Sequence, residues 1–275
     1  ARVDAMRAKY AADPEFQKHE ALLDNGIDLA RLTYPEVRTL RCQMQYIFQD
    51  PYSSLNPRMT VANIIGEGLL AHKYCKKANE RMHEEILQTM EDCGLAPYFL
   101  HRYPHQFSGG QRQRIGIARS LAVHPKFVVC DEAVSALDVS IQSQIINLLQ
   151  DLKEQQHLTY LFITHDLSVV KYISDRIGVM YLGNLVELAD SQEIFDHPMH
   201  PYTEALLESI PTTEEKRDLA VLEGDIPSPV NPPKGCKFHT RCKYCTEICT
   251  HVVPDWEEVT PNHFVACHHK LHTNE

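Results

Sequence analysis

The sequence predicts an α/β fold built around a parallel sheet, and three observations support this. Short apolar segments alternate with helical patterns through the middle of the chain, as expected for strands buried on both faces and joined by helices. Polar residues follow directly after several of these segments, so they would meet at the carboxyl edge of the sheet, where open α/β sheets bind ligands. The chain has 275 residues, 43% of them hydrophobic, which is enough to bury a core.

The expected elements follow in order. The first hundred residues are expected to form a charged helical lead-in, a strand, a polar loop and a mostly helical region, at 1–25, 43–48, 50–58 and 60–100. Alternating helices and strands are expected next, with helices at 111–124, 139–155 and 167–175 and strands at 126–132 and 158–166. A hairpin that turns at Gly183-Asn184 and a stiff linker with four prolines follow, at 177–190 and 226–233.

Charge and hydropathy exclude several classes of protein. The net charge of −10 argues against a nucleic-acid binder, which usually shows a basic face. No apolar run approaches the roughly 18–20 residues of a membrane helix, and the first residues lack the apolar stretch of a signal peptide. We therefore expect a soluble, cytoplasmic protein that reaches a membrane only through a partner.

The segment FVVCDE at 127–132 ends an apolar strand with two carboxylates. Because an unpaired charge is costly inside a sheet, Asp131 and Glu132 are expected at its carboxyl edge. Asp131 can hold Mg²⁺, usually through water. Glu132 can orient and deprotonate an attacking water, a role worth on the order of 10²–10⁴ in rate. The alternative is a strand that ends in a solvated acidic turn.

The segment FSGGQRQR at 107–114 opens a long helical pattern. Ser108 can cap the helix, and Gly109 and Gly110 let backbone N–H groups approach a phosphate at the positive helix end. Gln111 adds a side-chain donor. An ordinary glycine-rich helix cap is the alternative.

Three further polar positions lie at the ends of expected strands or just beyond them. The Gln49 carboxamide can contact Mg²⁺ or its water, and the His165 imidazole can reach a γ-phosphate. The turn SALD, which ends at Asp138, can contact a neighbouring subunit and respond to its state. Each has an ordinary alternative, as a polar loop residue or a capped strand end.

Taken in order, these features resemble the nucleotide-binding subunit of ABC transporters over about residues 27–190. The matching motifs are the Q-loop, signature motif, Walker B, D-loop and H-loop, at Gln49, Ser108–Gln111, Asp131–Glu132, Ser135–Asp138 and His165. The resemblance implies a P-loop NTPase-like (RecA-like) core with an inserted helical subdomain, and ATP with Mg²⁺ as cofactors. It also implies a head-to-tail dimer in which ATP lies between the Walker face of one ATPase subunit and the signature motif of the second.

A finer resemblance is to the oligopeptide, dipeptide and nickel importers. It rests on FQDPYSSLNPRMTV, DEAVSALDVSIQ, HPMHPYTEALLESIP and a cysteine-rich C-terminal extension. It implies a subunit that couples ATP hydrolysis to peptide import from the inner face of the cell membrane. Permease subunits would contact the Q-loop region, Gln49 to Arg58, and a solute-binding protein would act indirectly. One departure is Ala133, where proline is usual. The expected domains are 1–60, 61–107, 108–205 and 206–275.

The phosphate-cradling loop G-x-x-x-x-G-K-[ST] is absent from the sequence. We interpret the chain as an N-terminally truncated piece, with residues 1–25 as an insertion, and expect it to hydrolyse ATP poorly or not at all alone. Two alternatives remain, a soluble ABC-type ATPase unconnected with transport and a non-catalytic metal-binding module.

Five cysteines gather near the C-terminus, as Cys236-x5-Cys242-x6-Cys249-x17-Cys267 with Cys245 inside the second gap. Four thiolates that converge from loops suit a [4Fe–4S] cluster or a tetrahedral zinc ion. The resemblance favours the iron–sulfur cluster, with Cys236, Cys242, Cys249 and Cys267 as ligands. Zinc and a site without metal remain as alternatives.

Overall fold

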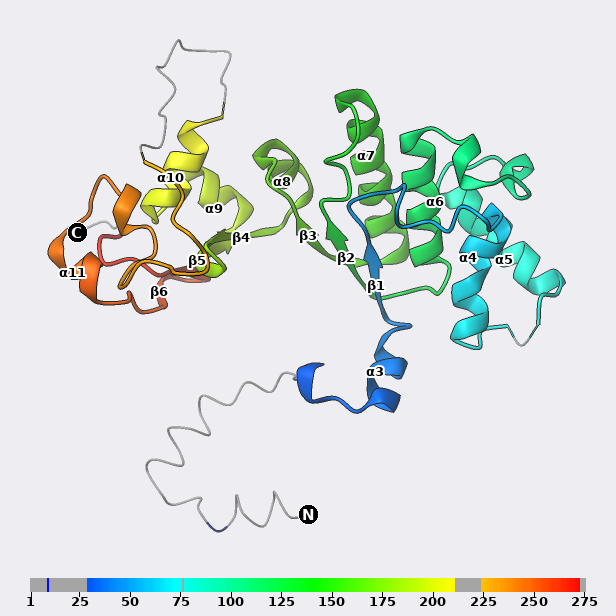
Figure 1. The fold of residues 1–275 in the computed structure, drawn as a ribbon, viewed down its shortest axis with the longest axis horizontal. Helices are drawn as coiled ribbons and strands as arrows, with labels where there is room; N and C mark the ends of the chain where they lie inside the picture. Colours follow the sequence, from blue (N-terminus) through cyan, green and yellow to red (C-terminus); the bar gives the residue numbers. More distant parts are fainter. Residues whose placement is uncertain (1–8, 10–28, 76, 211–223, 273–275) are drawn as a thin grey trace. The chain divides into compact units, whose positions relative to one another are not determined.

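A computed structural model describes Lys9 and residues 29–75, 77–210 and 224–272 (Figure 1). The helical lead-in predicted for residues 1–25 lies outside the described residues, apart from Lys9. The chain divides into two compact units, residues 1–43 and 44–275. The first unit contains the 3-10 helix η1 (Leu29–Arg31) and helix α3 (Tyr34–Leu40).

The second unit begins with a three-stranded parallel sheet in the order β1-β2-β3. Its strands are β1 (Met44–Ile47), β2 (Phe127–Asp131) and β3 (Thr159–Ile163). The predicted α/β class with a parallel sheet is therefore confirmed. Since parallel strands end at the same edge, residues that follow β1, β2 and β3 are brought together there.

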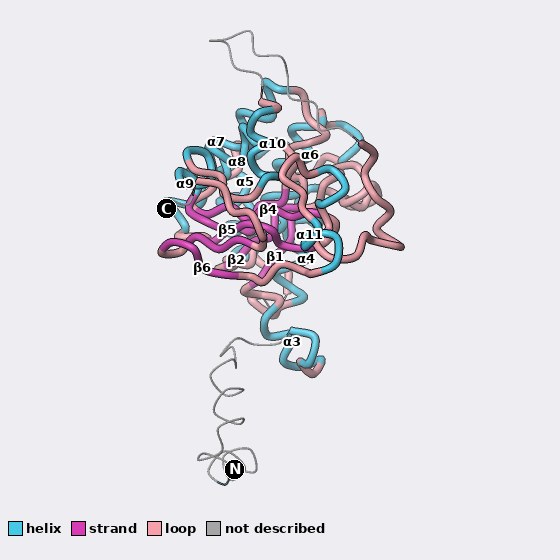
Figure 2. The backbone as a smooth tube through the Cα atoms, turned by 90° about the vertical axis from the view of Figure 1, so that its left-hand side faces the viewer, coloured by secondary structure: helices cyan, strands magenta, loops and turns pink. Residues whose placement is uncertain are grey.

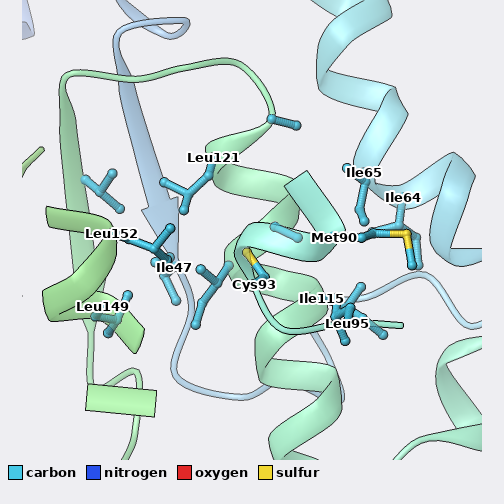
Figure 3. Packing of buried hydrophobic residues seen from close by; sticks show 14 of the residues in the cluster. Ile47, Ile64, Ile65, Met90, Cys93, Leu95, Ile115, Leu121, Leu149 and Leu152 are labelled. Atoms are coloured by element: carbon cyan, nitrogen blue, oxygen red, sulfur yellow. The ribbon is translucent and has the colours of Figure 1, made fainter. Parts of the chain in front are cut away.

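Helices connect and cover these strands. They are α4 (Val61–Ala71), α5 (Glu80–Asp92), α6 (Gly109–Leu121), α7 (Val139–Gln156) and α8 (Leu167–Ile173), with short 3-10 helices η2 (Pro97–Phe99) and η3 (Pro104–Gln106). Their buried apolar side chains form one continuous core with the sheet. Figure 3 shows Ile47 of β1 near Leu121 of α6 and Leu152 of α7. The helical region of residues 61–107 thus shares its core with the strands.

The two faces of the three-stranded sheet differ in burial. On one face, Val128 and Cys130 are fully buried and form part of the core. On the other face, Leu161 and Ile163 are 49% and 45% exposed, and Tyr46 is 36% exposed. A parallel sheet is normally covered on both faces. Within the part of the chain that the structure describes, one apolar face of this sheet is open.

A second, antiparallel sheet has the order β4-β5-β7-β6. Its strands are β4 (Arg176–Tyr181), β5 (Asn184–Asp190), β6 (Glu257–Thr260) and β7 (His263–Val265), magenta with the other strands in Figure 2. The predicted hairpin of β4 and β5 is confirmed, but its turn is Leu182-Gly183, one residue earlier than predicted, because Asn184 already pairs with Tyr181. Both turn residues have positive φ. The cysteine-rich extension supplies β6 and β7, two short strands that the sequence pattern did not reveal.

Short helices complete this part of the chain. They are α9 (Ser191–Asp196), α10 (Pro201–Glu208), η4 (His239–Arg241) and α11 (Glu247–His251). A separate apolar cluster centred on Tyr181, Val186 and Phe238 joins hairpin and extension, with Cys236 and Cys242 packed against it. Among the described residues, no helix combines the length and apolar character needed to cross a membrane.

Candidate active site

Asp131 is the last residue of β2, at the carboxyl edge of the parallel sheet. The hydroxyl of Tyr46, on the neighbouring strand β1, donates a hydrogen bond to Asp131 Oδ2. This hydrogen bond is the main reason that the pKa of Tyr46 lies above its ordinary value, with smaller contributions from burial and the nearby negative charge. Sequence reasoning identified Asp131 but missed Tyr46, which carries no motif signal.

Glu132 follows β2 in an unusual backbone conformation. Its φ of +42° lies in the left-handed region, which costs a residue other than glycine on the order of 1–3 kcal/mol. The surrounding chain holds this conformation, since Glu132 N–H donates to the Ile163 carbonyl at 2.9 Å and the Glu132 carbonyl accepts from Ser135 N–H at 3.1 Å. A strained residue persists only where the surrounding packing holds it, and such residues cluster at functional sites.

Both oxygens of the Glu132 carboxylate have partners from the neighbouring strand ends. The Gln49 side-chain amide, two residues after β1, donates to Oε2. His165 Nδ1, two residues after β3, lies 3.3 Å from Oε1. The His165 side chain is 75% exposed and that of Glu132 29% exposed. The structure thus gathers Gln49, Asp131, Glu132 and His165 at one open edge of the sheet.

The Ser108–Gln111 segment forms the start of α6. Gln111 N–H donates to Ser108 Oγ at 3.4 Å, and Ser108 N–H donates to Gln111 Oε1 at 3.1 Å, which is a reciprocal capping box. The Gln111 carboxamide oxygen is therefore engaged within its own helix. The predicted phosphate-binding role of this segment stays a prediction.

The two glycines of this segment meet different surroundings. A Cβ on Gly110 would lie 2.4 Å from Ile141 Cγ2 of α7, whereas one on Gly109 would lie 3.6 Å from Leu137. Gly110 is therefore needed for the close approach of α6 and α7. Asp138 caps α7 by accepting from Ile141 N–H at 3.0 Å, so the signature segment and the SALD turn meet at the starts of two packed helices.

The loop after Gln49 is attached to α6 by two arginines. The Arg112 guanidinium lies 3.7 Å from the centre of the Tyr52 ring, and Arg112 Nε donates to the Pro104 carbonyl at 2.7 Å. Arg119 donates to the Ser54 carbonyl and lies over the Phe48 ring. The polar loop predicted after Gln49 is thus held along the same helix that begins with Ser108.

The four cysteines predicted as metal ligands lie close enough to influence one another. Burial, with smaller contributions from the neighbouring thiols, raises the pKa of Cys242 to about 11 and that of Cys267 to about 12. Cys236 N–H donates to the Cys249 carbonyl at 2.9 Å, which draws their two loops together. In the described ranges, however, no three His, Cys, Asp or Glu side chains are arranged to hold a metal ion. The structure therefore does not support the predicted iron–sulfur or zinc coordination.

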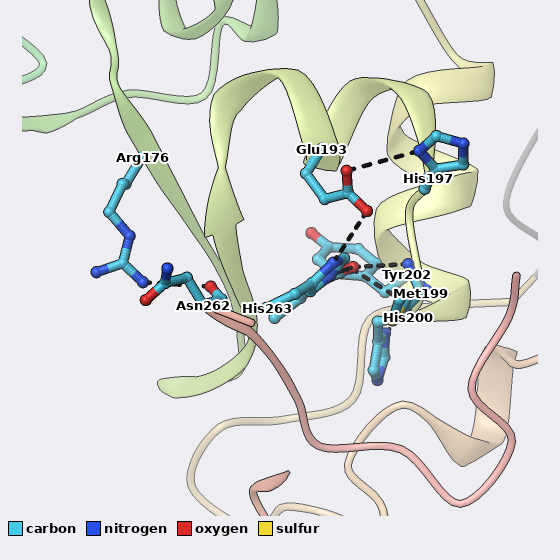
Figure 4. Close-up of polar contacts among 9 residues, drawn as sticks. Arg176, Glu193, His197, Met199, His200, Tyr202, Asn262 and His263 are labelled. Atoms are coloured by element: carbon cyan, nitrogen blue, oxygen red, sulfur yellow. Dashed lines mark hydrogen bonds and ion pairs between the residues drawn. The ribbon is translucent and has the colours of Figure 1, made fainter. Parts of the chain in front are cut away.

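A buried polar cluster, which we call the Glu187 hub, links hairpin and extension. Glu187 on β5 is fully buried and accepts hydrogen bonds from the backbone N–H groups of Met199 and His200, at 2.6 and 3.1 Å. His263 Nε2 of β7 lies 2.8 Å from Glu187 Oε1, while Nδ1 lies 3.7 Å from Glu193 Oε1 (Figure 4). Sequence reasoning missed this hub because its members are up to 76 residues apart.

His200 begins α10 beside the hub. Its Nδ1 accepts from Tyr202 N–H at 3.0 Å, and its ring lies 5.8 Å from the ring of Phe238. Burial lowers the pKa of His200 to about 4, so the imidazole is neutral near neutral pH.

Comparison with known proteins connects this geometry to a family. Residues 12–135 match the family described as ABC transporter, and residues 186–249 match the one described as oligopeptide/dipeptide transporter, C-terminal region. The first match begins at residue 12, inside the segment 1–25 that the sequence analysis interpreted as an insertion. The second match covers part of the cysteine-rich extension.

Relatives and solved structures agree. The chain is 52% identical to the oligopeptide transport ATP-binding protein AppF of Bacillus subtilis, over 90% of this chain and 76% of that protein. It is 47% identical to OppF of Haemophilus influenzae, over 88% of this chain and 74% of that protein. A dimeric ATP-binding cassette solved with ADP and Pi is similar at a TM-score of 0.54 and 27% identity, over 61% of this chain and 72% of that one. The CbiO1 structure from Clostridium perfringens, part of an ABC transporter complex, is similar at a TM-score of 0.53 and 25% identity, over 59% of this chain and 63% of that one.

With five motifs in order along the chain, a parallel sheet, and about half of its residues shared with such relatives, the chain belongs to the oligopeptide transport ATP-binding proteins of the ABC transporter family.

Proposed function

We propose that this chain is the subunit that hydrolyses ATP to drive peptide import. The observation that carries the proposal is the open edge where Gln49 and His165 both contact Glu132, beside Asp131. These four side chains together can activate water next to a bound triphosphate. An ordinary solvated acidic turn would not require polar side chains from the ends of three strands to meet.

Each side chain has a role in this proposal. Glu132 accepts the proton of the attacking water, and Gln49 and His165 orient its two carboxylate oxygens. Asp131 would hold the Mg²⁺ that accompanies ATP, through water. That ion would neutralise charge on the phosphates when bound.

We propose further that the Ser108–Gln111 cap serves the nucleotide of a second ATPase subunit in a head-to-tail dimer. In support, the cap and the Asp131–Glu132 edge are built by different elements. The cap packs against the start of α7, whereas the edge is formed by the ends of the strands. A similar cassette was solved as a dimer bound to ADP and Pi.

Membrane permease subunits would dock on the loop from Gln49 to Arg58, and a solute-binding protein would deliver the peptide to them. The chain would then lie at the cytoplasmic face of the membrane. Tyr52, 63% exposed, presents a large ring on this loop. Copurification with integral membrane subunits tests this assignment, and copurification with ribosomes or DNA would contradict it.

The proposal requires a phosphate-cradling loop that the 275 residues do not contain. The open apolar face around Leu161 and Ile163 is where a further helix could cover the sheet. We therefore expect the printed chain alone to turn over ATP poorly. We define the upstream-extended chain as this sequence with a segment that carries such a loop fused before Ala1. Steady-state ATPase assays of the 275-residue chain and of the upstream-extended chain test this expectation. Robust ATP turnover by the 275-residue chain would contradict it.

We propose that the cysteine cluster holds a [4Fe–4S] centre through Cys236, Cys242, Cys249 and Cys267, with zinc as the alternative. The support is the spacing of the four cysteines in the sequence and the hydrogen bond from Cys236 N–H to the Cys249 carbonyl, which draws two of their loops together. Binding would require the thiols to move closer, because the described side chains are not arranged around one ion. An absorbance band near about 400 nm in anaerobically purified protein is expected for the iron centre. Colourless protein with stoichiometric zinc would favour zinc, and protein without either metal would contradict both.

A further inference from the structure

Tyr46 reaches the candidate Mg²⁺ ligand through the register of two parallel strands. It lies opposite Val129 of β2. Because alternate residues of a strand share a face, Asp131 lies on the same face as Val129, two residues further on. The length of the tyrosine side chain carries its hydroxyl past Val129 to Asp131 Oδ2.

The ring that presents this hydroxyl packs against Phe48, and the backbone of the same residue is hydrogen-bonded to α6. Its centre lies 4.7 Å from that of Phe48, with the planes tilted by 51°. The Tyr46 carbonyl accepts a hydrogen bond from Ser120 Oγ of α6 at 3.0 Å. The hydroxyl therefore belongs to a ring that contacts Phe48, on a strand that pairs with β2 and is bonded to α6.

We propose that Tyr46 is a positioning residue for Asp131, whose carboxylate it holds in the rotamer that receives Mg²⁺. This inference rests on the proposed function, because Asp131 needs a fixed rotamer only if it serves a bound ion. A phenol suits the task since it donates a hydrogen bond without cancelling the negative charge, as a lysine would.

The first test uses Tyr46→Phe in the upstream-extended chain with its partner subunits. This change keeps the ring and removes the hydroxyl. The Mg²⁺ concentration for half-maximal ATP turnover should rise on the order of tenfold, as when other groups that orient metal ligands are removed. Turnover at saturating Mg²⁺ should change little, because Glu132 and its partners are intact. Tyr98→Phe, at a tyrosine 70% exposed on η2, is the matched control and should leave the Mg²⁺ dependence unchanged.

Asp131→Asn separates failure of this inference from failure of the proposed function. If Asp131→Asn abolishes turnover while Tyr46→Phe keeps the wild-type Mg²⁺ curve, Tyr46 has no positioning role and the proposed function stands. If Asp131→Asn retains full turnover, the proposed function itself is wrong.

A second test needs no nucleotide and uses the 275-residue chain. With tyrosines labelled with ¹³C at Cζ, the Tyr46 signal is assigned by its loss in Tyr46→Phe. At one fixed neutral pH, its chemical shift should change in Asp131→Ala, because the acceptor of the phenol hydrogen bond is lost. An unchanged Tyr46 chemical shift in Asp131→Ala would mean that the hydrogen bond is not made in solution, and would overturn the inference.

Discussion

Two carboxylates of this protein, Glu132 and Glu187, each lie beside a histidine, yet their surroundings differ completely. Glu132 is 29% exposed and receives its partners Gln49 and His165 from loops at strand ends. Glu187 is fully buried and is surrounded by donors from the backbone and from His263. In the proposed function, the exposed pair of Glu132 and His165 serves reaction chemistry, whereas the buried pair of Glu187 and His263 holds two parts of the fold together.

Energetics explain the difference. An exposed ion pair is worth only about 0–1 kcal/mol, so Glu132 and His165 can exchange partners when a ligand arrives. Removing one partner of a buried pair costs about 3–5 kcal/mol, because a charge is left without compensation. The Glu187 hub should accordingly resist change and hold the extension on the hairpin.

The largest expected effect is on activity. In the upstream-extended chain, Glu132→Gln should lower ATP turnover by about 10²–10⁴, since the amide cannot accept the proton of the attacking water. Thermal unfolding should stay close to wild type, because the Gln49 and His165 partners are at the surface. A variant that turns over ATP at the wild-type rate would remove Glu132 from the chemistry.

The next effect is on stability. Glu187→Gln should lower the free energy of unfolding by about 3–5 kcal/mol, because His263 and two buried backbone donors lose their carboxylate. The matched control is Glu257→Gln at the exposed pair with Lys270, which should cost no more than about 1 kcal/mol. Chemical denaturation measures both. Equal losses of unfolding free energy in the two variants would show that the Glu187 hub stabilises the fold no more than an exposed ion pair does.

Acid should weaken the same region through His200. Its folded-state pKa of about 4 lies below the ordinary 6.5, so the unfolded chain binds the proton more readily. The resulting stability is fully present above about pH 6.5 and is lost as the pH falls towards 4. The gap between the two values corresponds to ~3 kcal/mol.

His200→Asn tests this assignment, because asparagine can still cap α10 but does not titrate there. Denaturation between pH 7 and 4 should show a flatter pH dependence in the variant than in wild type. Parallel curves would assign the acid sensitivity to groups other than His200.

The smallest expected effect distinguishes two glycines of α6. Gly110→Ala should cost about 1–3 kcal/mol, because its Cβ would meet Ile141 at 2.4 Å. Gly116→Ala should instead gain up to about 1 kcal/mol, since nothing lies within 4 Å and alanine favours the helix. Denaturation of the two variants measures these opposite signs. A gain for Gly110→Ala would show that the helices can separate without cost.

The α/β class, the hairpin near Gly183 and the family could all be predicted from the residues alone, because they depend on local patterns and on the order of motifs. It also placed Gln49, Asp131, Glu132 and His165 at strand ends, which the parallel sheet then gathers. Three contacts could be seen only once the chain was folded: Tyr46 with Asp131, Gly110 with Ile141, and His263 of β7 with Glu187. Those contacts depend on strand register and helix packing between distant segments, and no local pattern of residues encodes them.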